Sequence, residues 1–292
     1  MNAHTIGAGT VLVGIDGSPG SAVALRWAMD HADRLGRIVP VATFLSGPFE
    51  YGFGTSAGIE ATGEPYRSET VLRLAEFLAE HAPPLVDDGV VIEHRAGPGL
   101  VEAAADSELL VVGTRGWGLR SDPSSGSVAA YCARHAGVPV ALVPHDVPAD
   151  DEQLDVVVGL DGSARAVEAL SWAVHHLRQT ARVTALRVVT VGPVVGDPLA
   201  VPSKTAIDTA HRELEEDVAK AVADLDGHAG IELLVVNGDP REALGTAVAD
   251  ADVLVVGARG HGVIHRLLLG SVSTALAHHP TLPTIVVPSD RG

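Results

Sequence analysis

The chain has 292 residues, of which 46% are hydrophobic and 3% aromatic, and its formal net charge is −17. A chain of this length favours two domains, and its core would consist mainly of Val, Ala and Leu. The negative charge argues against nucleic acid and anionic membrane surfaces as partners, because both are bound by clustered cations.

The same sequence pattern occurs twice in the chain. Three blocks recur at an almost constant offset: 11–37 at 156–182, 109–118 at 253–262, and 139–144 at 283–288. A constant offset over so much sequence is typical of a duplicated domain. We therefore predict a first domain over residues 1–146, a Pro-containing acidic linker over 147–154 and a second domain over 155–292.

Each copy is expected to alternate strands with helices. In the second copy, short β-branched runs predict buried strands, and apolar residues at helical spacing predict helices. The strands are predicted at 155–160, 183–189, 231–236, 252–257 and 283–288, and the helices at 164–180, 203–226, 240–250 and 271–279. This order predicts an α/β fold with a parallel sheet covered on both faces, which binds ligands where the strand order reverses.

A glycine motif follows the fourth strand of each copy. It consists of Gly-x-x-Gly, nine further residues and Gly-Ser before a helix: Gly113, Gly116, Gly126 and Ser127 in the first copy, and Gly257, Gly260, Gly270 and Ser271 in the second. Bare backbone and a helix N-terminus together favour an anion site. The alternative is a set of ordinary turn and capping residues. The only lysines are Lys204 and Lys220, so a phosphate site here would use main-chain amides in place of a P-loop lysine.

An aspartate ends the first strand of each copy, Asp16 in "GIDGS" and Asp161 in "GLDGS". Its carboxylate would face the same crevice and accept a ribose hydroxyl, or hold a metal ion beside phosphates. The alternative is that it caps the following helix, a role that Ser18 and Ser163 are also suited to take.

With these two motifs the chain resembles the universal stress protein family, in its ATP-binding branch. The resemblance covers nearly the whole chain, as two tandem Rossmann-like domains. It implies a five-stranded parallel sheet of order 3-2-1-4-5 in each domain and ATP, with Mg²⁺, in each crevice. It places phosphates on the glycine motif, an aspartate near the nucleoside and adenine on the main chain at the end of strand two, which by internal position is Val41 and Leu186. The implied cofactor-binding residues are Asp16, Val41, Gly113, Arg115, Gly116, Gly126, Ser127 and Val128, and Asp161, Leu186, Gly257, Arg259, Gly260, Gly270, Ser271 and Val272.

The same resemblance implies pairing of the two halves through strand five, further assembly to a homodimer, and a role as an ATP-dependent regulator in stress survival or growth arrest. The sequence shows no nucleophile–base pair and no lysine in either glycine motif, so we assign no catalytic residue. We expect at most slow ATP hydrolysis, with Arg115 and Arg259 as the cations beside the phosphates. The alternatives are a scaffold with degenerate nucleotide pockets and an enzyme of the wider adenine-nucleotide hydrolase superfamily. The sequences "DGSPGS" and "DGSARA" fit neither signature of those enzymes.

A cytoplasmic location is expected. Cys132 is the only cysteine, so no internal disulfide forms, which fits a reducing compartment. The N-terminal residues lack the basic flank and apolar stretch of a signal peptide, and charges and glycines interrupt the apolar runs short of a membrane span. The histidines 261 and 265 lack the third and fourth ligands that a zinc site needs, so no metal site is assigned.

Overall fold

The computed structural model describes most of the chain as two compact units. The described residues are 6–46, 63–82, 88–116, 127–147, 154–177, 181–189, 204–223, 230–237, 248–249, 251–258 and 282–288. Unit 1 contains residues 6–147 of this set and unit 2 contains residues 154–288. No helix among the described residues is both long and apolar enough to span a bilayer.

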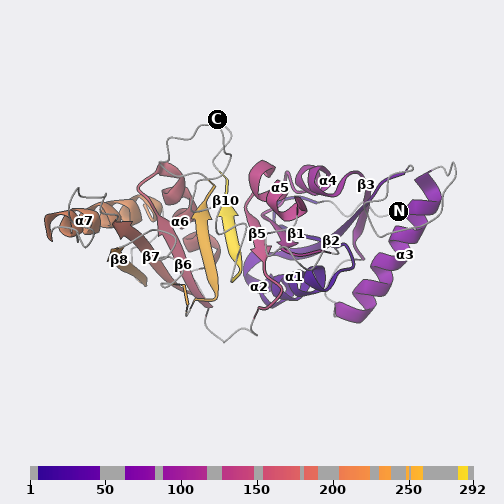
Figure 1. The fold of residues 1–292 in the computed structure, drawn as a ribbon, viewed down its shortest axis with the longest axis horizontal. Coiled ribbons are helices and arrows are strands. Elements are labelled where there is room, and N and C mark those ends of the chain that lie inside the picture. The colour runs from indigo at the N-terminus through magenta and orange to yellow at the C-terminus, as the bar shows by residue number, and fades with distance from the viewer. Residues whose placement is uncertain are drawn as a thin grey trace, which may run out of the picture. The chain divides into compact units, whose positions relative to one another are not determined.

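Unit 1 is a parallel sheet with helices on both faces (Figure 1). Its strands are β1 (Thr10–Gly14), β2 (Arg37–Phe44), β3 (Val90–Glu93), β4 (Leu109–Gly113) and β5 (Val140–Val143). Its helices are α1 (Pro19–Asp30), α2 (Ala32–Leu35), α3 (Gly63–His81), α4 (Ala96–Ala103) and α5 (Ser127–His135). The strand order is β3-β2-β1-β4-β5, and each neighbouring pair is parallel. Helices α1 and α3 pack together on one face of the sheet, and α4 and α5 pack together on the other.

Unit 2 repeats this sheet. Its strands are β6 (Leu154–Leu160), β7 (Ala181–Val189), β8 (Ile231–Asn237), β9 (Val253–Gly257) and β10 (Thr284–Val287). They lie in the order β8-β7-β6-β9-β10, again with parallel neighbours. Helices α6 (Ala164–Leu177) and α7 (Lys204–Ala221) pack against each other and against β6 and β7. The predicted order 3-2-1-4-5 is therefore confirmed in both units.

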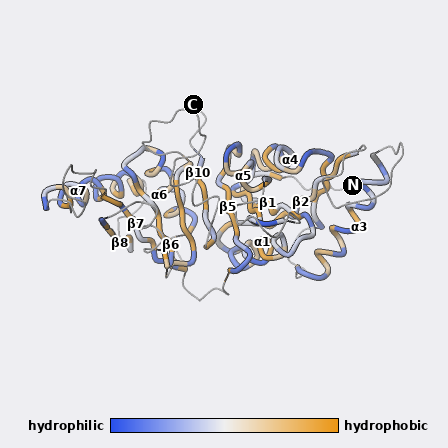
Figure 2. Tube along the Cα trace, in the orientation of Figure 1, coloured by the Kyte–Doolittle hydropathy of each residue, from blue (hydrophilic) through white to orange (hydrophobic). Residues whose placement is uncertain are grey.

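The central strands form because their side chains are buried on both faces of each sheet. Val11, Leu12 and Val13 of β1 have no exposed surface, and Leu254 and Val255 of β9 have none either. A parallel strand covered by helices on both sides is expected to be apolar throughout rather than alternating. Figure 2 shows this as orange strands, in contrast to the largely blue α7.

The helices match their predicted positions where the structure describes them. Predicted helix 164–180 corresponds to α6, and predicted helix 203–226 corresponds to α7, which ends earlier, at Ala221. The predicted helices at 240–250 and 271–279 lie almost entirely outside the described residues. In both units the strand order reverses between the first and fourth strands, β1 and β4 or β6 and β9, and this reversal defines the edge at which a ligand would bind.

Candidate functional site

The turn after the first strand has the same geometry in both units. In unit 1, Asp16 Oδ1 accepts a hydrogen bond of 2.9 Å from the Ser18 N–H, and Gly17 between them has a φ of 77°. In unit 2, Asp161 Oδ1 accepts a hydrogen bond of 3.0 Å from the Ser163 N–H, and Gly162 has a φ of 81°. A glycine stands in each turn because a side chain is strained at positive φ.

The serines, and not the aspartates, cap the following helices. Ser18 Oγ accepts a hydrogen bond of 3.2 Å from the Ser21 N–H at the start of α1, and Ser163 Oγ accepts one of 3.2 Å from the Ala166 N–H at the start of α6. Each aspartate therefore closes the turn with one carboxylate oxygen and leaves the capping of the helix to the serine.

In the structure, the Asp16 side chain lies next to Gly116 of the glycine motif of unit 1. A Cβ atom added to Gly116 would lie 2.5 Å from Asp16 Oδ2. Gly116 comes just after β4, whereas Asp16 comes just after β1, and these are the two strands between which the order reverses. Arg115 and Gly116 are exposed residues at this edge of the sheet.

Gly113, the first glycine of this motif, is needed for packing. A Cβ atom on Gly113 would lie 2.6 Å from the carbonyl oxygen of Gly20, in the first turn of α1. A Cβ atom on Gly20 would in turn overlap the carbonyl oxygen of Arg115. The chain after β4 thus runs against the first turn of α1, and Gly20 is a site residue that sequence reasoning missed. Its only signal in the sequence was a second glycine soon after the Asp-Gly-Ser turn.

The end of the motif in unit 1 begins α5. Ser127 is the first residue of this helix and is exposed, and Val128 is partly buried. Gly126 lies outside the described residues. In unit 2, Gly257 ends β9, and a Cβ atom on it would lie 3.0 Å from the carbonyl oxygen of Arg165. The remaining predicted residues of unit 2, Arg259, Gly260, Gly270, Ser271 and Val272, also lie outside the described residues.

Val41 and Leu186 lie inside their strands rather than at the ends. Val41 has no exposed surface, and its carbonyl accepts a hydrogen bond of 2.9 Å from the Ile15 N–H. Leu186 is 1% exposed and stands in register with Gly159 on β6. Strand β2 continues to Phe44 and β7 to Val189. The adenine contact of Val41 and Leu186 remains a prediction of the family resemblance.

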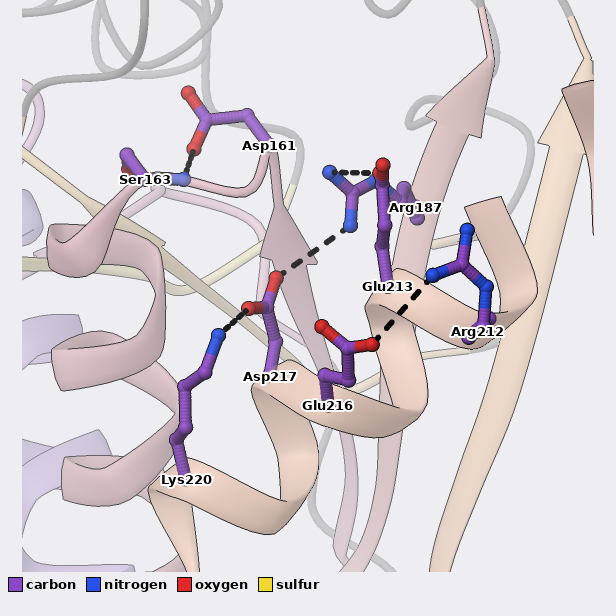
Figure 3. A network of polar contacts seen from close by, with 8 residues as sticks. All are labelled: Asp161, Ser163, Arg187, Arg212, Glu213, Glu216, Asp217 and Lys220. Carbon is purple, nitrogen blue, oxygen red and sulfur yellow. Dashed lines mark hydrogen bonds and ion pairs between the residues drawn. The ribbon is translucent and has the colours of Figure 1, made fainter. Parts of the chain in front are cut away.

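Sequence reasoning also missed a charged cluster beside the turn of unit 2 (Figure 3). Arg187 of β7 forms ion pairs with Glu213 at 3.2 Å and with Asp217 at 3.4 Å, both on α7. Lys220 Nζ donates a hydrogen bond of 3.2 Å to the second oxygen of Asp217. The signal in the sequence was an arginine within the otherwise apolar run "ALRVV".

Cys132 is a buried side chain of α5. It has no exposed surface, and burial raises the pKa of its thiol to about 12. A thiol in this state is protonated at neutral pH and is a poor nucleophile. Among the described residues, no group of three or more His, Cys, Asp or Glu side chains is placed to hold a metal ion.

Comparison with known proteins places the chain in a family. The sequence model of the universal stress protein family matches residues 8–144 and again residues 155–288. A universal stress protein of Mycobacterium tuberculosis is 29% identical over 290 residues, which cover 94% of this chain and 95% of the relative. A further relative, from Mycolicibacterium smegmatis, is 27% identical over 291 residues, which cover 95% of this chain and 96% of the relative.

Solved structures share the fold over the whole chain. The crystal structure of a universal stress protein from Archaeoglobus fulgidus has a TM-score of 0.65 at 20% identity, with 97% of this chain and 99% of that one covered. A putative universal stress protein from Pseudomonas aeruginosa has a TM-score of 0.59 at 12% identity, with 97% and 94% covered. The chain belongs to the universal stress protein family, whose domain it contains in two tandem copies.

Proposed function

We propose that this chain is a nucleotide-binding universal stress protein that binds ATP with Mg²⁺ and acts as a regulator in stress response or growth arrest. The observation that carries the proposal is the meeting of Asp16 with Gly116. It places a carboxylate and exposed main chain together at the point where the strand order reverses. Ligands of open α/β sheets bind at such points.

The residues of unit 1 suit the parts of a nucleotide. Phosphates would lie on the exposed main chain of Gly116, next to the exposed residue Arg115, and at the N-terminal end of α5, where Ser127 is exposed. Unpaired N–H groups and the partial positive charge of a helix N-terminus attract anions. The carboxylate of Asp16 would take a ribose hydroxyl or share in holding Mg²⁺.

We propose regulation rather than rapid turnover because phosphoryl transfer depends on cations placed around the phosphates. The two lysines of the chain, Lys204 and Lys220, belong to α7, and neither is part of a glycine motif. Arg115 would contribute one cation to unit 1, which suits binding and slow hydrolysis.

Thermal unfolding of the full chain tests this proposal. ATP with Mg²⁺ is expected to raise the unfolding temperature, because a ligand at about a hundredfold above its dissociation constant stabilises the folded state by about 2.7 kcal/mol. ADP, AMP and cyclic AMP give the selectivity, and phosphate release over hours measures hydrolysis. If none of these nucleotides shifts the transition, the chain is a scaffold and the proposal is wrong.

A further inference from the structure

A half-buried arginine at the carboxyl edge of the sheet distinguishes unit 2 from unit 1. Arg187 is level with Leu160, the last residue of β6, and its side chain is 13% exposed. The registers of the two sheets make Leu186 the counterpart of Val41, since these residues pair with Gly159 and Gly14. The counterpart of Arg187 is therefore Ala42, which has no exposed surface.

Helix α7 holds the Arg187 guanidinium in place. Nη2 lies 3.2 Å from Glu213 Oε2, and Nη1 lies 3.4 Å from Asp217 Oδ2. The Asp217 side chain is 7% exposed, and its second oxygen is 3.2 Å from Lys220 Nζ. A guanidinium offers several N–H donors in a fixed plane, so its pairing with two carboxylates of α7 restrains its orientation.

The guanidinium lies against the turn that carries Asp161. A Cβ atom added to Gly162 would come too close to Nη2 of Arg187, so only a glycine fits there without displacing the arginine. Asp161 comes directly before this glycine, and Figure 3 shows its side chain at the end of β6, with the carboxylate turned toward Ser163. A donor-rich cation and an acceptor carboxylate thus flank one turn at the carboxyl edge of the sheet.

We propose that Arg187 is a ligand-selecting residue of unit 2, which reads the sugar of the bound nucleotide together with Asp161. This inference rests on the proposed nucleotide binding. One hydroxyl of a ribose cis-diol donates a hydrogen bond to Asp161, and a sugar oxygen accepts one from Arg187. A deoxyribose lacks one hydroxyl and leaves a charged group without its partner, which weakens binding about tenfold or more. Unit 1, with Ala42, discriminates less.

Calorimetry with ATP and 2′-deoxy-ATP, both with Mg²⁺, tests the inference on the full chain. All proteins carry Gly116→Val, which is expected to disable unit 1, so the remaining binding event belongs to unit 2. We expect this event to be about tenfold weaker with the deoxynucleotide. The double substitution Arg187→Leu with Asp217→Leu removes the ion pair without leaving a buried charge alone. It should weaken ATP binding about tenfold and abolish the discrimination between the two nucleotides.

Two further variants keep the test decisive. Arg187→Lys retains the charge and its pairing with α7 but loses the planar donors, so the discrimination should fall severalfold while the unfolding temperature is kept. Arg212→Gln removes an exposed cation of α7 that pairs with Glu216 at 3.7 Å, and both nucleotides should bind as before.

The outcomes separate this inference from the proposed function. If Arg187→Lys keeps the full discrimination, or if Arg212→Gln reduces it equally, Arg187 does not read the sugar. The same holds if the folded double variant binds both nucleotides as its parent does. If the unsubstituted chain binds no ATP at all, the proposed function itself is wrong.

Discussion

Gly113 and Gly116 belong to one sequence motif but lack a side chain for different reasons. Gly113 faces the main chain of α1 at Gly20, so the absence of a side chain lets α1 pack closely against the end of β4. Gly116 faces a side chain, the carboxylate of Asp16, at the exposed edge of the sheet. Of these two glycines, Gly116 therefore supports the interpretation of the motif as a ligand site, whereas Gly113 serves helix packing.

We expect Gly116→Val to abolish ATP binding to unit 1 while the sheet stays folded. The new Cβ atom would lie 2.5 Å from Asp16 Oδ2, and the end of a side chain can move aside more readily than backbone. The displaced carboxylate and the valine methyl groups would occupy the phosphate and sugar positions. Calorimetry measures the loss of one binding event, and circular dichroism measures the fold.

Gly7→Val is the matched control, because a Cβ atom on Gly7 meets nothing within 4 Å and this residue precedes β1, away from the carboxyl edge. ATP should bind to the control as to the unsubstituted chain. Unchanged binding to a folded Gly116→Val protein would show that the main chain after β4 is not the phosphate site.

We expect Cys132 to resist alkylation in the folded protein. With a pKa of about 12, its thiol is ionised at pH 8 to about one part in ten thousand, and the side chain has no exposed surface. The rate of reaction with iodoacetamide at pH 8 should therefore be far below that of the same chain in urea. A folded-state rate close to the urea value would contradict the burial of this thiol.

At the scale of elements, the start of α1 is fixed by its contact with the chain after β4. Ser18 caps the helix and Pro19 begins it, which are favourable residues at these positions. Gly20 then allows the Arg115 carbonyl to approach. In unit 2 the first turn of α6 lies against the end of β9 in the same way, but Arg165 stands where unit 1 has Gly20. Unit 2 thus has an arginine side chain at the position where a side chain on Gly20 of unit 1 would clash with the Arg115 carbonyl.

We expect Gly20→Ala to lower the free energy of unfolding by about 1–3 kcal/mol, the usual cost of forcing extra atoms into packed structure. The added methyl group would overlap a backbone oxygen, which cannot turn aside as a side chain does. Urea unfolding followed by circular dichroism gives the change. Gly7→Ala should leave the midpoint unchanged or raise it slightly, and an equal loss in both variants would mean that the contact with Arg115 has no effect.

At the scale of the whole molecule, the duplication has produced two units with one fold and different crevice residues. The carboxyl edge of unit 2 has Arg187 and Arg165 where unit 1 has Ala42 and Gly20. The sequence adds a further difference between the glycine motifs, since Arg266 aligns with Asp122. Arg187 is already paired with Glu213 and Asp217, so the added attraction for an anion in unit 2 would come from Arg165 and Arg266.

We therefore expect the two sites to be unequal, with unit 2 the tighter. A pair of unit charges about 6 Å apart in water contributes roughly 0.7 kcal/mol, and ATP carries several negative charges, so a tenfold difference is expected. Calorimetry on single-site variants decides the order. Gly270→Asp should remove the tighter event, and Gly126→Asp should remove the weaker one or change nothing. Loss of the tighter event in Gly126→Asp reverses the assignment.

Pairing of the two halves through strand five and assembly to a homodimer remain predictions of the family resemblance. Hydrogen exchange tests the first, because amides of a free edge strand exchange fast whereas those of a paired strand are protected. Residues 140–143 and 284–287 should be protected from exchange along both edges of each strand.

Sedimentation at several protein concentrations tests assembly to a homodimer, and a monomer at all of these concentrations would contradict that prediction.

The sequence by itself determined the duplication and the alternation of strands and helices, and it indicated Asp16 and Asp161 at the end of the first strand of each copy. These features follow from short stretches of chain: buried parallel strands are apolar throughout, and Asp-Gly-Ser closes its own turn through neighbouring residues. The order of the strands and the nucleotide site came from the family resemblance, and the structure confirmed the strand order.

Only the tertiary structure decided which residues meet at the crevice. Asp16 reaches Gly116, and Arg115 reaches Gly20, because β1 and β4 are neighbours in the sheet although distant in sequence. Arg187 finds Glu213 and Asp217 because α7 packs over β7. An arginine in a strand has no partner that local sequence can name, since the carboxylates that stabilise it belong to another element and are brought to it by the folding of the whole unit.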